Sequence, residues 1–69
     1  MTDPDFLAKL HRYQTARLRG APEGTGYVRI TWACTADPDA PAVGWIGLDG
    51  PTKGHHGVSP ASELDEWCL

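Results

Sequence analysis

In the first part of the chain, mostly apolar side chains fall on one face at intervals of about 3.6 residues: Phe6, Leu7, Leu10, Tyr13, Gln14, Arg17 and Leu18. This spacing is typical of one face of an α-helix. Thr2 or Asp3 can cap the helix and Pro4 suits its first turn, while Gly20 is a typical residue just after a helix end. The pattern therefore predicts a helix that begins at Pro4 and ends before Gly20.

The spacing then changes to strict alternation over residues 27–34. Val28, Ile30, Trp32 and Cys34 fall on one face, while Tyr27, Arg29, Thr31 and Ala33 fall on the other. Alternation in a segment rich in β-branched and aromatic residues predicts a half-buried strand.

A second strand, antiparallel to the first, is expected over residues 43–48. The segment between them, residues 35–41, holds two prolines and two aspartates and is expected to be a loop. Gly44 and Gly47 weaken the second strand, but they also leave room for Trp32 or Trp45 to lie across the sheet.

The C-terminal third admits two interpretations. A short third strand is expected near residues 56–58. Ser59 can then cap a last helix with Pro60 in its first turn, and Ala61, Leu64, Trp67 and Cys68 share one face at helical spacing. The alternative is a terminal strand over residues 66–69.

Together these elements predict an α+β fold in a single small domain over residues 1–69. We expect a small antiparallel sheet of two or three strands, with an N-terminal helix and a short C-terminal helix packed on it. A chain of 69 residues buries only about 60% of the surface of its unfolded form, so its core is thin. Self-association would add burial, and we therefore expect a homodimer.

Composition favours a cytoplasmic protein. No stretch approaches the ~20 apolar residues that a membrane span requires, and the polar start, residues 2–5, is unlike a secretory leader. In that compartment Cys34 and Cys68 are expected to be free thiols, packed as small buried side chains, rather than a disulfide.

Charge is divided between the two halves of the chain. Residues 1–35 carry five basic and three acidic side chains, whereas residues 36–69 carry Lys53 against six carboxylates; the sum is the formal charge of −3. Such a split bears on association before it bears on chemistry.

Three kinds of chemical site find little support. Cys34, Cys68, His55 and His56 are metal-ligand types, but they lack the paired spacing of a structural zinc site, so a metal-stabilised module remains an alternative only. Lys9, Arg12 and Arg19 give the first helix a basic side that could contact nucleic acid, yet the chain is acidic overall. No spacing indicates nucleophilic or acid–base catalysis, and no catalytic residue or cofactor is expected.

The remaining hypothesis is a non-enzymatic module that binds another protein, of an accessory, regulatory or inhibitor type. Three tryptophans and two tyrosines are more aromatic surface than a thin core readily hides. Tryptophan, tyrosine and arginine also dominate the energetics of protein interfaces. We expect contact through Trp32, Trp45, Tyr27 and Arg29, with Arg12 and Arg19 as steering charges.

Overall fold

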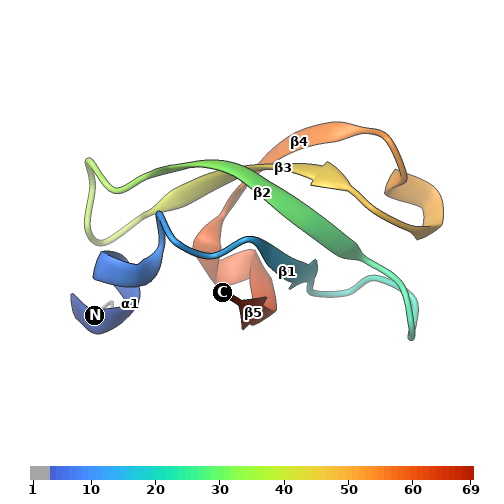
Figure 1. Cartoon of the computed structure of the whole chain (residues 1–69), viewed down its shortest axis with the longest axis horizontal. Helices are drawn as coiled ribbons and strands as arrows, with labels where there is room; N and C mark the ends of the chain where they lie inside the picture. The colour runs from blue at the N-terminus through green and yellow to red at the C-terminus, as the bar shows by residue number, and fades with distance from the viewer. Residues whose placement is uncertain (1–3) are drawn as a thin grey trace.

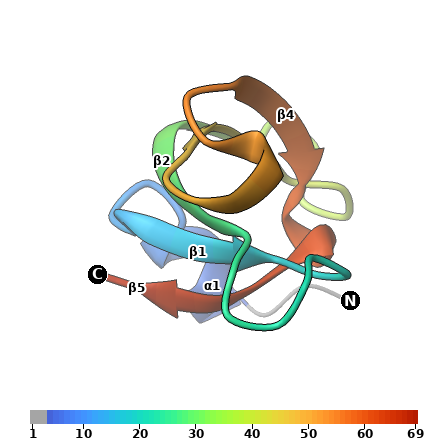
Figure 2. The ribbon, with the colours of Figure 1, turned by 90° about the vertical axis from the view of Figure 1, so that its right-hand side faces the viewer.

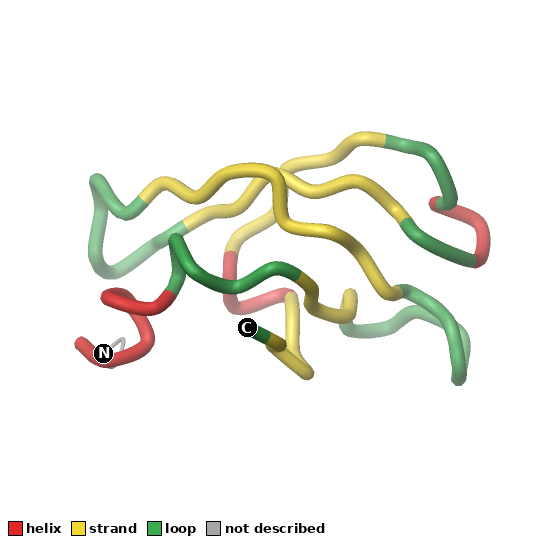
Figure 3. The backbone as a smooth tube through the Cα atoms, viewed as in Figure 1, coloured by secondary structure: helices red, strands yellow, loops and turns green. Residues whose placement is uncertain are grey.

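The computed structural model describes residues 4–69, and its main feature is one five-stranded antiparallel sheet (Figure 1). A short helix, α1, covers Pro4–Lys9. The strands are β1 (Thr15–Leu18), β2 (Tyr27–Cys34), β3 (Ala42–Gly47), β4 (His56–Pro60) and β5 (Leu64–Cys68). Two 3₁₀ turns complete the chain, η1 at Gly50–Thr52 and η2 at Ala61–Glu63. Figure 3 shows the strands as the main regular structure, joined by long loops.

The strands lie in the order β4-β3-β2-β1-β5. The first four form a meander, and the last returns to the opposite edge, where it pairs with β1. Viewed end-on, the sheet curls from β4 through β2 and β1 to β5, with η2 spanning the open side (Figure 2). The Ala61 amide donates to the Pro41 carbonyl, which anchors that turn to the start of β3.

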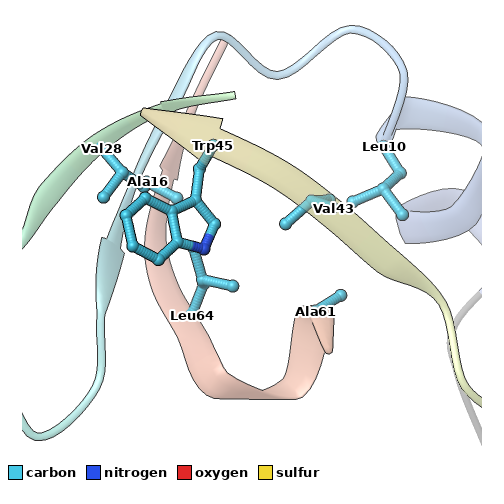
Figure 4. Close-up of a cluster of buried hydrophobic side chains, with 7 residues drawn as sticks. All are labelled: Leu10, Ala16, Val28, Val43, Trp45, Ala61 and Leu64. Carbon is cyan, nitrogen blue, oxygen red and sulfur yellow. The ribbon is translucent and has the colours of Figure 1, made fainter. Parts of the chain in front are cut away.

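The core lies inside this curl. Seven side chains form it (Figure 4): Leu10, Ala16, Val28, Val43, Trp45, Ala61 and Leu64. They come from every strand except β4, together with η2 and the turn after α1. The sequence therefore specifies one small core, in which Trp45 is the only aromatic side chain.

The predicted fold class is wrong in its main features. The sheet has five strands rather than two or three; in residues 4–69 the first helix is only Pro4–Lys9 and the short C-terminal helix is absent. The expected first helix ends at Lys9, and residues 15–18 form a strand. Thr15 is β-branched, and Ala16 and Leu18 also fit an alternating pattern; pairing of β1 with strands on both sides outweighs the helical spacing. The proposed caps Thr2 and Asp3 lie outside the described residues.

The C-terminal helix is also wrong, whereas the alternative of a terminal strand is confirmed, with the bounds Leu64–Cys68 in place of residues 66–69. After the single turn Ala61–Glu63 the chain extends as β5, so Leu64 enters the core and pairs with Leu18. Since only a few residues remain after Pro60, a helix there would gain little from its own hydrogen bonds. Pairing with β1 satisfies the same backbone groups and buries Leu64.

The strand predictions fare better. The bounds of β2 are those expected, β3 is shifted by one residue to Ala42–Gly47, and the short third strand is β4. In residues 4–69 no helix is long and apolar enough to cross a membrane.

A bulge in β2 overturns the predicted alternation of that strand. Ile30 pairs with Trp45 but Trp32 pairs with Gly44, so Thr31 is an extra residue. An inserted residue reverses the facing of everything after it. As a result Val28 and Ile30 face the core, while Trp32 and Cys34 face outward and Ala33 turns inward against Val43.

Candidate functional site

The side of β2, β3 and β4 that faces away from the core forms one exposed surface, which we call the outer face. Because directly paired residues share a face, the register assigns it in cross-strand rows. One row is Arg29, Ile46 and His56; the next is Trp32, Gly44 and Val58; the third is Cys34, Ala42 and Pro60. Tyr27 and Leu48 extend the surface at the far end of β2, where the Leu48 amide donates to the Tyr27 carbonyl.

Trp32 is the largest side chain on the outer face. Its indole lies flat against Gly44, where a Cβ atom would overlap the ring nitrogen Nε1. The residue is nevertheless 49% exposed. A tryptophan held in this way has one face supported by the sheet and the other open to solvent, so little side-chain entropy remains to be lost on binding.

Exposed apolar side chains gather on this surface. Among the residues that the structure describes, five large hydrophobic side chains are exposed: Tyr27, Trp32, Leu48, Val58 and Leu69. Only Leu69 lies off the outer face. Contiguous apolar patches of this kind on small proteins mark interaction sites.

The charges around the outer face are few. The segments 27–34, 42–47 and 56–60 contain no aspartate or glutamate, and Arg29 is their only lysine or arginine. At the Tyr27 end, the Tyr27 hydroxyl donates to Glu66 Oε1 at 3.4 Å, and that carboxylate also lies 3.6 Å from Arg17 Nε. The Glu66 carboxylate is thus already paired with Tyr27 and Arg17, and Arg29 gives the outer face an exposed positive charge.

Arg17 holds the long β1–β2 connection beside this face. Its guanidinium donates to the carbonyls of Thr25 at 2.9 Å and Ala21 at 3.1 Å, and its side chain is only 17% exposed. Asp49 acts at the same end of β2, where its Oδ1 accepts the amides of Gly26 at 2.8 Å and Tyr27 at 3.1 Å. Sequence reasoning missed both roles, because neither spacing nor composition marks which loop a polar side chain will tie down.

The structure brings together three of the six predicted contact residues. Tyr27, Arg29 and Trp32 all lie on the outer face of β2. Contrary to the prediction, Trp45 does not lie on the outer face. It is 9% exposed, points into the core and donates from Nε1 to Ser59 Oγ at 3.1 Å. The Trp45 ring packs on Gly57 of β4. A glycine next to a tryptophan ring was predicted, but at Gly44 or Gly47 rather than at Gly57.

The two predicted steering charges lie elsewhere. Arg12 follows α1 in an exposed turn. Arg19 lies just beyond β1 and forms an ion pair with Asp65 at 3.8 Å. Because the helix ends at Lys9, these two arginines do not continue its basic side, and the structural premise of the nucleic-acid alternative is wrong.

Arg19 instead borders a separate hollow of about 350 Å³ beside α1 and β5. The aromatic rings of Phe6, Tyr13 and Trp67 meet next to it, with centroids 5.1–5.9 Å apart. This cluster packs against the core and accounts for Trp67. The three tryptophans therefore have three environments, of which only that of Trp32 is largely open.

The metal-ligand types are dispersed. Cys34 and Cys68 are free thiols, as expected, but both are exposed rather than buried. Cys68 pairs with Thr15, which is linked through Arg29 and Ile46 to His56, so four strand spacings of about 4.8 Å separate this cysteine from His56. In residues 4–69 no three histidine, cysteine or carboxylate side chains come together as metal ligands.

Comparison with protein-family models, curated proteins and solved structures finds no match to this chain.

Proposed function

We propose that this protein is a small non-enzymatic module, accessory or regulatory in type, that binds another protein through the outer face. The observation that carries the proposal is the gathering of Tyr27, Trp32, Leu48 and Val58 on one side of the sheet. A chain of 69 residues has a thin core, so exposing these side chains gives up apolar burial that would stabilise the folded state. A partner that covers them recovers that burial.

The charges favour one kind of partner. Arg29 is exposed beside Ile46 and His56, and no carboxylate from the three strands competes for it. A complementary surface would place apolar side chains over Trp32 and Leu48 and a carboxylate near Arg29. We propose the cytoplasm as the compartment in which this binding takes place.

The test begins with affinity capture by the tagged protein and identification of captured proteins by mass spectrometry. Each captured protein is then purified and titrated against the wild type and against Trp32→Asp and Leu48→Asp. The matched control is Leu69→Asp, which adds the same charge at an exposed apolar position off the outer face. Circular dichroism and urea denaturation establish that each variant is folded.

We expect the two outer-face variants to bind more than about tenfold more weakly, while the control binds like the wild type. Arg29→Glu leaves the apolar packing in place and should slow association most strongly at low salt. The proposal is wrong if every captured protein binds the outer-face variants and the control equally well, or if capture yields no protein that discriminates between them.

A further inference from the structure

The two edges of the sheet differ in how they are protected. At one edge, β5 carries Asp65 and Glu66, and a register shift with a positive φ of 50° at Glu66 interrupts its pairing. Charges, bulges and prolines are the usual devices that keep an edge strand from pairing with another chain. At the other edge, β4 runs without a register shift through its pairing with β3 and carries no lysine, arginine or carboxylate; of these devices it has Pro60, at its end.

The hydrogen bonds between β4 and β3 show which residues of β4 point their backbone groups away from β3. The Gly47 amide donates to the His55 carbonyl and the Ala61 amide to the Pro41 carbonyl. In an antiparallel ladder the bonded pairs alternate, so Gly57 and Ser59 also point their backbone groups toward β3. His56, Val58 and Pro60 then point theirs outward, and proline, which has no amide hydrogen, occupies a position where none is needed for the fold.

From this arrangement we infer that β4 pairs with β4 of a second copy of this chain, antiparallel and about a twofold axis at Val58. That axis sets the whole strand His56–Pro60 against itself. Val58 meets Val58 of the second copy with two backbone hydrogen bonds, and each His56 amide meets a Pro60 carbonyl. Pro60 has no amide hydrogen for the His56 carbonyl opposite it, so the pairing has four backbone hydrogen bonds, two at Val58 and two from the His56 amides.

The neighbouring register fits less well. An axis at Gly57 would oppose Ser59 and Pro60 to His55 and Gly54, which belong to the turn, where Gly54 has a φ of 79°. The axis at Val58 also brings an uncharged apolar pair together and keeps the two His56 side chains apart. The Trp32–Gly44–Val58 row would then continue across the axis into its copy, which leaves both outer faces open. The inference therefore does not depend on the proposed function.

The first test is the mass of the wild-type protein by sedimentation equilibrium between about 10 µM and 1 mM, the range expected for a small interface. We expect the mass to rise from 7.5 kDa toward twice that value. Val58→Asp should remain monomeric at every concentration, because it places two carboxylates opposite each other at the axis.

The second test reads the register directly. Residues opposite each other in a hydrogen-bonded pair have Cα atoms about 5.5 Å apart, which a disulfide can span. In a background with Cys34→Ser and Cys68→Ser, we expect Val58→Cys to form a covalent dimer on mild oxidation. Leu48→Cys, equally a cysteine in place of an exposed apolar residue, should stay monomeric.

A wild-type protein that stays at 7.5 kDa throughout overturns the inference. So does self-association that Val58→Asp leaves unchanged, or cross-linking through position 48 as readily as through position 58. These outcomes leave the partner-binding role of Trp32 and Leu48 standing, whereas failure of those two variants to affect partner binding leaves the dimer standing.

Discussion

The contact between Trp32 and Gly44 allows the outer face to be tested by stability alone, with no partner required. A methyl group at position 44 would overlap the indole, so Gly44→Ala should displace Trp32 from the sheet. Trp32 is 49% exposed, so displacement uncovers about 100 Å² of ring surface, since a buried tryptophan hides roughly 150–250 Å². At about 25 cal/mol per Å² this loss is close to 2.5 kcal/mol, an upper value because unfolded chains are partly compact.

Alanine also has a conformational advantage over glycine in a strand, by roughly 0.5–1 kcal/mol. The expected net loss in the free energy of unfolding is therefore about 1–2 kcal/mol for Gly44→Ala in the wild type. In the Trp32→Ala background the overlap is gone, and the same change should stabilise by about 0.5–1 kcal/mol. The two backgrounds together predict a coupling energy of about 2 kcal/mol.

Urea denaturation of the wild type, the two single variants and the double variant measures this coupling. Gly57→Ala serves as the control, because a methyl group there overlaps Trp45 rather than Trp32 and should cost the same with or without Trp32. A coupling energy below about 0.5 kcal/mol between positions 44 and 32 would refute the placement of Trp32 across the outer face.

Three further predictions concern the fold around this face. Ala33→Asp should destabilise the protein by at least about 2 kcal/mol in urea, while Cys34→Asp changes stability little; the reverse result would show that β2 has no bulge at Thr31. Arg17→Ala should cost about 1–3 kcal/mol, because it removes the donor shared by the loop carbonyls, and a loss under 0.5 kcal/mol would contradict that role. Cys34 and Cys68 should both react with a thiol reagent in the native protein, monitored by mass; protection of either until unfolding would contradict their exposure.

The sequence predicted β2 and β3 well because their information is local. An alternating run of β-branched and aromatic residues, bounded by glycine turns and a proline-rich loop, is compatible with few structures other than a strand. The bulge at Thr31 has no such local mark, since neither glycine nor proline stands there. Only the positions of Gly44 and Trp45 on the neighbouring strand decide which tryptophan can lie outside.

The terminal segments were mispredicted because their structure depends on each other. Residues 15–18 and 64–68 are each short and ambiguous, and each becomes a strand by pairing with the other. Helical spacing at Leu7, Leu10 and Leu18 satisfied a local rule that tertiary pairing then overrode. For the same reason Arg12 and Arg19 were assigned to a helix that does not extend to them. Tyr27, Arg29 and Trp32 lie together on the outer face because the pattern of β2 is local.

The pairing of β1 with β5 also has a consequence for the order in which the molecule assembles. Leu18 meets Leu64 and Thr15 meets Cys68, so these contacts join positions about 50 apart in a chain of 69. The hairpin contacts of the meander β1–β4 are local, so they can form before this long-range pairing. Until β5 docks, β1 has an unpaired side and the core lacks Leu64. A partly folded chain without this pairing therefore exposes both edges of the meander, and a chaperone or another chain can engage them.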